Sequence, residues 1–228
     1  MISVVIPTLN AEARLGACLA ALIPAAVDGL VKEVVICDGG SADATTAIAE
    51  DAGAVILKAP AGRGGQLRRG AEAARGDCLL FLHADTVLDP TWTEDVRAVM
   101  GDEARAGVFT LAFDAPGLAP KIVAGGAMAR TRLLLSPYGD QGLFLSRALY
   151  DRLGGYRDAP LFEDVDLVDR IVRHGGRKAL VVFPSRARTA ADRYRRDGYA
   201  KRVLKNFACL AMYRAGVAPA KIASFYRS

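Results

Sequence analysis

The sequence has few cysteines, no long hydrophobic run and no leader-like start. Its four cysteines are spread over 228 residues without a C-x-x-C pair, which argues against a zinc site or a disulfide framework. The longest uncharged run, Leu15 to Val27, has 13 residues and contains Pro24, whereas a membrane-spanning helix needs about 20. The chain opens directly on the apolar segment 2–6, without a basic region or a cleavage site. We therefore expect no secretory signal and a cytoplasmic protein.

The common phosphate-binding motifs are also missing. No G-x-G-x-x-G follows either of the first two apolar segments, and there is no Walker lysine, so a dinucleotide-binding or P-loop protein is disfavoured. The segment Ala84-Asp85-Thr86 resembles the end of a phosphatase D-x-D-x-T motif. His83 stands where that motif needs its nucleophilic aspartate, so a phosphatase is excluded.

Charge is distributed unevenly along a chain whose net charge is +5. From Arg186 onward there are 11 Lys or Arg and 2 Asp, which leaves the first 185 residues at −4. A basic end of this kind is typical of contact with anionic lipid, a diphosphate, an anionic acceptor or nucleic acid, or is only a solvated helix face. Because the tail has fewer interleaved exposed aromatics than a stacking platform requires and the upstream part is acidic, we expect no nucleic-acid binding. A peripheral contact of the basic tail with the inner face of a membrane remains open.

Short apolar runs alternate with segments of helical periodicity, and 52% of the residues are hydrophobic. The pattern predicts strands at 2–6, 33–37, 54–57 and 78–83, and β-α-β-α order of this kind predicts an α/β fold. We expect a Rossmann-like, mostly parallel central sheet flanked by helices, with ligands at the carboxyl ends of the strands.

The second half is less regular. It predicts strands at 108–113 and 179–183, a helix from Phe162 to His174, and a helical tail from Arg193 to about Arg214. In that tail an apolar stripe is expected at Tyr199, Val203, Phe207, Leu210 and Ala211. With no repeat or low-complexity linker, we expect one domain over 1–228, divided into a nucleotide-binding half (1–105), an acceptor half (106–190) and the basic tail (191–228).

Polar loops follow the first two predicted strands. The first loop runs Pro7-Thr8-Leu9-Asn10-Ala11-Glu12, and in the second loop Asp38 is followed by two glycines that let a ligand approach the backbone. A carboxylate at a strand tip accepts hydrogen bonds from a base or ribose. We therefore expect a nucleoside to lie here.

Arg63 stands in a glycine-rich loop just before Gln66. Its guanidinium offers a fork of donors suited to a base carbonyl or a phosphate. Contact with the donor is one interpretation, and a plain surface arginine is the other.

His83 and Asp85 are two residues apart at the end of the fourth predicted strand, hence on the same side of the chain if it is extended there. A carboxylate at a strand tip beside a diphosphate is a typical ligand of Mg²⁺ or Mn²⁺. We predict Asp85 as the metal ligand. For His83, coordination, a hydrogen bond to phosphate and a structural role all remain open.

Glu163, Asp164 and Asp166 are gathered at the start of a predicted helix, where the helix dipole alone stabilises carboxylates. Glu163 and Asp164 also follow an apolar loop and precede an apolar helix face. One of the two is expected to point into a cleft and to act as a general base toward an acceptor.

Five segments in this order resemble the family-2 glycosyltransferases of the GT-A fold over nearly the whole chain. The family's first strand is matched by residues 4–10, and its D-G-S-x-D turn by residues 38–43. Its D-x-D metal motif is matched by residues 82–85 and its acceptor-side segment by residues 139–144. The pair Glu163-Asp164 resembles its E-D motif. Histidine replaces the first acid of the metal motif, which puts metal affinity or metal choice in doubt.

The resemblance implies a metal-dependent, inverting single displacement, with Asp164 as the catalytic base, Mg²⁺ or Mn²⁺ as cofactor on Asp85 and His83, and Gln141 and Glu163 contacting the acceptor. It implies a nucleotide-sugar donor, with a UDP-sugar as first candidate, and a small-molecule or glycan acceptor. The expected donor-binding residues are Pro7, Thr8, Asn10, Glu12, Asp38, Arg63, Gln66 and Ala84.

The tail, from Arg193 to Tyr199 and at 216–219, resembles a compact bacterial subgroup associated with radical-SAM genes and arsenosugar-type pathways. Two alternatives stay open at the level of sequence. One is a catalytically silent homologue that binds nucleotide sugars, and the other is a polyprenyl-phosphate sugar transferase. The retention of both Asp85 and Asp164 favours an enzyme.

Overall fold

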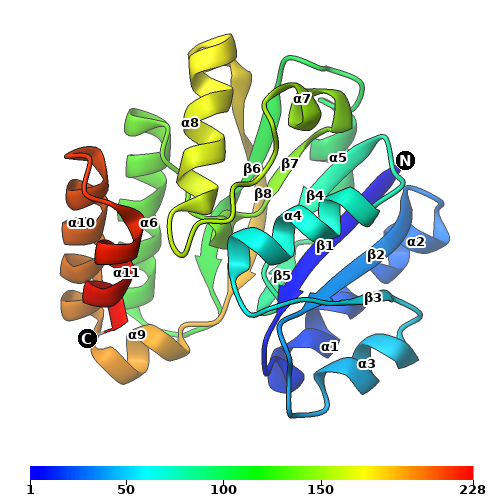
Figure 1. Cartoon of the computed structure of the whole chain (residues 1–228), viewed down its shortest axis with the longest axis horizontal. Helices are drawn as coiled ribbons and strands as arrows, with labels where there is room; N and C mark the ends of the chain where they lie inside the picture. Colours follow the sequence, from blue (N-terminus) through cyan, green and yellow to red (C-terminus); the bar gives the residue numbers. More distant parts are fainter. Residues whose placement is uncertain (228) are drawn as a thin grey trace.

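The computed structural model describes residues 1–227, and these form one eight-stranded sheet with helices on both faces (Figure 1). The strands are β1 (Ile2–Thr8), β2 (Val31–Asp38), β3 (Val55–Lys58), β4 (Cys78–Phe81), β5 (Thr86–Leu88), β6 (Ala106–Phe113), β7 (Leu143–Ser146) and β8 (Leu180–Thr189). Their order in the sheet is β3-β2-β1-β4-β7-β6-β8-β5. The first four neighbours are parallel throughout, whereas β7 is antiparallel to both β4 and β6, and β5 is antiparallel to β8. The sheet is therefore mixed: the N-terminal strands form one parallel part, and β6 and β8 form a second parallel pair.

The helices differ in length and fall into two groups along the chain. Those of the first half are α1 (Glu12–Ala20), α2 (Ile23–Val27), α3 (Thr45–Asp51), α4 (Arg63–Ala73) and α5 (Trp92–Arg97). Those of the second half are α6 (Leu118–Leu134), α7 (Arg147–Arg152), α8 (Glu163–Gly175), α9 (Asp192–Asp197), α10 (Tyr199–Arg214) and α11 (Pro219–Arg227), with short 3₁₀ turns at Gly139–Gln141 and Arg177–Ala179.

Alternation along the central strands builds a core on each face of the sheet. In β1, Val4 and Ile6 pack with α1, α2, α3 and α5, while Val5 faces α4, α7 and α8. Both faces of β1 are buried, as expected of a parallel strand covered on both sides. A third cluster joins the start of α8 to α10 and α11 through Val165, Cys209 and Ile222.

Helix α4 packs unusually close to β1 because of Gly70. A Cβ at this position would lie 2.4 Å from Cγ1 of Val5, a distance that no real side chain tolerates. The glycine thus lets the helix sit against the strand. The N-terminus of α4, with Arg63, is thereby fixed at the carboxyl edge of the sheet.

The tail differs from the single helix expected between Arg193 and Arg214. Gly198, with φ +83°, separates α9 from α10. The stripe expected to be buried on α10 is largely exposed, since Val203 and Phe207 face outward while Arg202, Cys209 and Leu210 are buried. Arg202 is turned inward because it pairs with Asp197 and Tyr226.

Candidate functional site

The loops after β1 and β2 are joined by the carboxylate of Asp38. Thr8 and Asp38 are partners in the register of β1 and β2, and the Thr8 hydroxyl donates to Asp38 Oδ1 at 2.9 Å. The Ser41 hydroxyl donates to the same oxygen, while the backbone N–H groups of Gly40 and Ser41 donate to Oδ2 at 3.0 and 2.8 Å. Burial alone would raise the pKa of Asp38, but these hydrogen bonds outweigh it and lower the pKa. Asp38 is therefore a carboxylate that organises its own loop.

Asn10 and Glu12 continue this connection. Asn10, with φ +51°, accepts from the Ala42 N–H at 2.9 Å, and Glu12 accepts from the Ala44 N–H at 2.9 Å. In return the Asn10 N–H donates to Ser41 Oγ at 2.8 Å. The two predicted donor loops thus form one platform, in which Pro7 is half-buried at the end of β1.

Gln66 ties α4 to the same edge of the sheet. Its side chain is buried, and Nε2 donates to the carbonyls of Thr8 and Cys37 at 2.8 and 2.7 Å. The amide donors are thus used within the fold. A donor-binding role for Gln66 stays a prediction, and its observed role is to position the start of α4.

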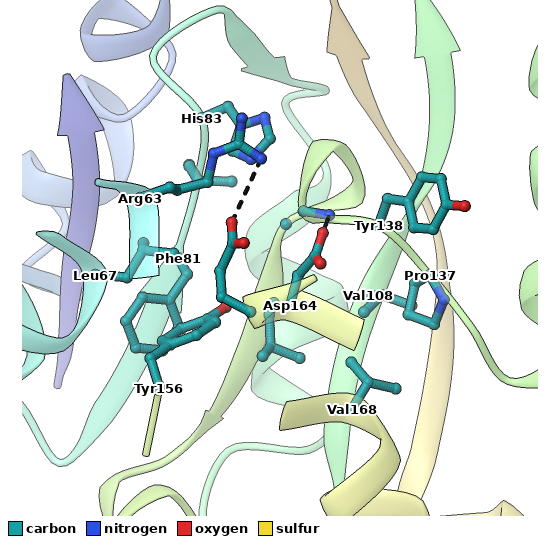
Figure 2. A pocket seen from close by; sticks show the side chains of 15 residues that line it. Arg63, Leu67, Phe81, His83, Val108, Pro137, Tyr138, Tyr156, Asp164 and Val168 are labelled. Carbon is teal, nitrogen blue, oxygen red and sulfur yellow. Dashed lines mark hydrogen bonds and ion pairs between the residues drawn. The ribbon is translucent and has the colours of Figure 1, made fainter. Parts of the chain in front are cut away.

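A pocket at this edge is lined by Arg63, His83 and Asp164, which come from α4, the segment after β4 and α8 (Figure 2). In Figure 2 these three side chains converge, with Phe81, Leu67 and Tyr156 forming an apolar wall beside them. Three segments that are far apart in sequence therefore supply a cation, an imidazole and a carboxylate to one cavity.

Glu163 lies buried behind Arg63. Its Oε1 is 3.5 Å from Nη1 of Arg63, and only 3% of its side chain is exposed. Burial, together with the neighbouring charge of Asp164, raises the pKa of Glu163 to about 7, although Arg63 opposes the shift. The raised pKa favours the protonated, neutral form of this buried carboxyl.

Asp164 is held in a fixed orientation at the first turn of α8. Its Oδ2 accepts a short hydrogen bond from the Gly139 N–H, and Oδ1 accepts from the Val165 N–H at 2.7 Å. Phe162, two residues before Asp164, has φ +64° and packs against Tyr213 with ring centroids 4.8 Å apart. A left-handed conformation in a bulky residue is strained, and here it immediately precedes the helix that carries the predicted base.

His83 lies close to the same carboxylate. A Cβ on Gly139 would be 2.7 Å from Nε2 of His83 and 3.2 Å from Oδ2 of Asp164, so glycine leaves room for both groups. Burial and the charges of Arg63 and Arg193 lower the pKa of His83 well below its usual value. The imidazole is accordingly neutral at neutral pH, as a metal ligand must be.

Asp85 does not share one extended face with His83. Strand β4 ends at Phe81, and the chain turns so that the Thr86 N–H donates to the His83 carbonyl at 3.1 Å. Asp85 is half-buried, as is Ala84, and its Oδ1 accepts from Oγ1 of Thr189 at 3.4 Å. No group of three His, Cys, Asp or Glu side chains that could hold a metal ion occurs within residues 1–227. One carboxylate fits a hard divalent ion that takes its other oxygens from a diphosphate and water.

Gln141 is fully buried, and its amide donates to the Phe109 carbonyl at 3.0 Å and accepts from Oγ1 of Thr131 at 2.7 Å. The structure thus places it behind the 3₁₀ turn 139–141, where it fixes that turn against β6 and α6. Its acceptor-binding role stays a prediction.

Asp140 and Arg130 are two polar residues that the sequence reasoning did not single out. Asp140 Oδ1 and Arg130 Nη2 are buried and have no hydrogen-bond partner in the described part of the chain. Burial and the charges of Asp164 and Asp85 raise the pKa of Asp140 to about 6, against the effect of Arg130. Arg130 stacks on Tyr138 at 3.6 Å from the ring centroid. Only the position of Asp140 beside Gln141 could have pointed to it in the sequence.

Comparison with known proteins gives a family match and several relatives. Residues 3–122 match the model of "Glycosyl transferase family 2". The chain is 32% identical over 108 residues to the putative glycosyltransferase EpsH of Bacillus subtilis (strain 168), covering 45% of this chain and 31% of that protein. It is 38% identical over 95 residues to glucosyl-3-phosphoglycerate synthase of Mycolicibacterium paratuberculosis, covering 38% of this chain and 29% of that protein. The matches thus span about a third of the length of these relatives.

Solved structures of glucosyl-3-phosphoglycerate synthase from Mycobacterium tuberculosis have a similar fold. The complex with Mn²⁺ and UDP-glucose superposes with a TM-score of 0.63 at 21% identity, covering 95% of this chain and 79% of that chain. The complex with Mg²⁺ and UDP gives a TM-score of 0.60 at 23% identity, covering 83% of this chain and 69% of that chain. The α/β fold of the GT-A type expected from the sequence is confirmed.

Proposed function

The chain belongs to glycosyl transferase family 2, and on this premise we propose that it transfers a sugar from a nucleotide-diphosphate sugar to an acceptor by an inverting single displacement. The observation that supports this most is the pocket in which Arg63, His83 and Asp164 meet at the carboxyl edge of the sheet. In a mixed sheet with a parallel half, this edge is where ligands bind.

The donor is proposed to lie over the platform formed by the loops after β1 and β2. Asn10, Glu12 and Asp38 hold these loops together, and Arg63 offers guanidinium donors at the pocket wall. The M. tuberculosis synthase was solved with UDP, UDP-glucose, Mn²⁺ and Mg²⁺. We therefore propose a UDP-sugar as the donor of this chain and Mn²⁺ or Mg²⁺ as its cofactor.

Asp85 would hold the divalent ion, with His83 nearby as a neutral imidazole. When bound, the ion would neutralise the negative charge that develops on the departing diphosphate. Since the leaving group then needs no proton, the site requires no acid on the donor side.

Asp164 is proposed as the general base on the acceptor side. As the acceptor oxygen attacks the anomeric carbon, its proton passes to the carboxylate of Asp164, and the bond between that carbon and the diphosphate oxygen breaks with its electron pair on the diphosphate. The Gly139 N–H and the Val165 N–H fix the orientation of this carboxylate. Attack on the face opposite the leaving group inverts the anomeric configuration.

The acceptor is proposed to be a small molecule or a glycan. One M. tuberculosis synthase structure contains glycerol 3-phosphate. Membership of the radical-SAM-associated subgroup is part of the proposal and is supported by the tail motifs alone. A peripheral contact of the basic tail with a membrane is also part of it, because α9 and the segment that follows carry many exposed cations.

The proposal is tested by calorimetry of the purified chain with UDP, GDP and dTDP, each with Mn²⁺ and with chelator, followed by a transfer assay with the matching nucleotide sugars. We expect metal-dependent binding of UDP. If no nucleoside diphosphate binds in the presence of either metal, the proposed function is wrong.

A further inference from the structure

Helix α6 turns an apolar stripe outward. Leu118, Ile122 and Leu133 are 71%, 63% and 70% exposed, and their spacing places them on one face of a helix. Gly125 and Ala129, which lie on the same face, are exposed as well and add no polar group. Surface helices of globular proteins normally direct such a stripe to the core, whereas this stripe is exposed to solvent.

Helix α10 also exposes large apolar side chains. Leu204 and Phe207 are each 69% exposed, whereas Arg202 on another side of the helix is buried. The inward side is occupied by Cys209 and Leu210, which pack with the start of α8 and with α11. The exposed Leu204 and Phe207 therefore lie outside the cluster that packs α10 against the start of α8 and α11.

The two exposed stripes lie on neighbouring helices. Figure 1 shows α6 and α10 together at one end of the molecule, and a groove between the C-terminal end of α6, α8 and α10 is lined by Leu134, Val172 and Phe207. We name this surface the α6–α10 face and define it by its exposed apolar side chains, Leu118, Ile122, Leu133, Leu134, Leu204 and Phe207. Several large apolar side chains exposed on neighbouring helices are typical of an interaction site.

Cations predominate around the α6–α10 face, although Asp169 of α8 also lines the groove and pairs with Arg214. Residues 115–139 contain three Lys or Arg and residues 198–228 contain six, and neither segment contains an Asp or Glu. Lys121, Arg132 and Lys201 are exposed. Apolar side chains among cations are the pattern of helices that lie in the interface of an anionic bilayer.

We propose that the α6–α10 face docks on the surface of an anionic lipid bilayer, with its leucine and phenylalanine side chains in the acyl boundary and its lysines and arginines at the headgroups. Among residues 1–227 no helix is long and apolar enough to cross a membrane, so the chain would lie on the bilayer. A second copy of the chain is a poorer occupant, because it would bring the same acid-free, cationic helices against each other. This inference extends the proposed membrane contact of the basic tail to a defined apolar surface and needs no glycosyl transfer.

The test is sedimentation of the full chain with vesicles of phosphatidylcholine, either alone or mixed with phosphatidylglycerol. We expect binding to the anionic vesicles, weaker binding to the neutral ones, and loss of binding at high salt. Leu204→Ser combined with Phe207→Ser should weaken binding at least about tenfold, because two exposed apolar side chains no longer leave water. Leu118→Ser combined with Ile122→Ser should do the same from α6.

A matched control is Ile23→Ser combined with Val27→Ser, which removes two exposed apolar side chains from α2 at the other end of the molecule (Figure 1). This control should bind vesicles as the wild type does. Equal weakening by the control, no binding of the wild type to anionic vesicles, or full binding by both α6 and α10 variants would overturn the proposal. So would a dimer in analytical ultracentrifugation that the Leu204/Phe207 variant abolishes.

The vesicle assay contains no nucleotide and is independent of the transferase. A chain that binds UDP but no vesicles refutes the docking surface alone. A chain that binds vesicles but no nucleoside diphosphate refutes the proposed function and leaves the docking surface standing.

Discussion

Replacing Asp38 with alanine should destabilise the loop platform and, through it, donor binding. The carboxylate accepts four hydrogen bonds, from the hydroxyls of Thr8 and Ser41 and from the N–H groups of Gly40 and Ser41. These fill all the acceptor sites that a carboxylate has. A nucleobase that reached this carboxylate would therefore have to displace one of the hydroxyls.

The loss of stability in Asp38→Ala depends on whether each hydrogen-bond donor finds another acceptor once the carboxylate is gone. The Gly40 N–H is on an exposed residue and can turn to water, whereas the Thr8 hydroxyl is buried and the Ser41 N–H is half-buried. A buried donor left without a partner costs about 1–3 kcal/mol. We expect Asp38→Ala to lower the free energy of unfolding by about 2–4 kcal/mol, since two such donors are affected and relaxation recovers part of the loss.

The variant Asp38→Asn removes the negative charge of the side chain but keeps its shape. Its amide oxygen can keep the two N–H donors, and its NH₂ group can donate to the two hydroxyls, so we expect a loss of only about 1 kcal/mol. Because the folded pKa of Asp38 is lowered, the stability it contributes is present above its unfolded pKa of about 3.9 and is lost as the pH falls through the folded value. The asparagine variant should lack this acid-side loss.

Urea unfolding and calorimetry with UDP measure the two effects. Asp38→Ala should lose both stability and about 1–3 kcal/mol of donor affinity, and Asp51→Ala, an exposed acid at the end of α3, should lose neither. If Asp38→Ala unfolded like the wild type, the carboxylate would not organise its loop. Loss of UDP binding at unchanged stability would instead assign Asp38 to direct contact with the nucleoside.

Three further predictions concern Asp85 and the two acids that line the pocket, Asp164 and Glu163. Asp85→Asn should abolish metal-dependent binding of UDP in calorimetry, because it removes the proposed oxygen ligand; equal binding with chelator would exclude a metal role. Asp164→Asn should keep UDP binding while kcat falls by about 10²–10⁴-fold. NMR of the wild-type product gives the anomeric configuration, which should be inverted relative to the donor. A near-normal rate of the variant, or a retained configuration in the wild-type product, would contradict the mechanism. Glu163 has its pKa raised to about 7, so the folded chain keeps a proton that the unfolded chain releases and stability should fall as the pH rises from about 4.3 to 7. Glu163→Gln should flatten this decline in urea unfolding at about pH 5 and pH 8, and an unchanged slope would show that Glu163 does not cause it.

The local pattern of apolar and polar residues was enough to predict the strands, the helices and the edge of the sheet at which the polar loops meet. The apolar runs of the first half are strands of the sheet because a buried parallel strand must be apolar on both faces. The loops after β1 and β2 lie side by side as expected, since neighbouring parallel strands end at the same edge. Glu163 and Asp164 lie at the first turn of a helix, where the sequence put them.

Only the tertiary structure decided which side chains remain available to a ligand and which surface stays uncovered. Gln66 and Gln141 satisfy backbone carbonyls of distant strands, and no local signal states that these carbonyls need a partner. The chain turns after β4, so His83 and Asp85 do not lie on one face of an extended strand as their spacing had predicted. On α10 the stripe expected from the periodicity is largely exposed, and Arg202 is the side chain turned inward, where it pairs with Asp197 and stacks on Tyr226. A sequence gives the spacing of polar and apolar residues, whereas burial and pairing depend on contacts that the chain makes only once it is folded.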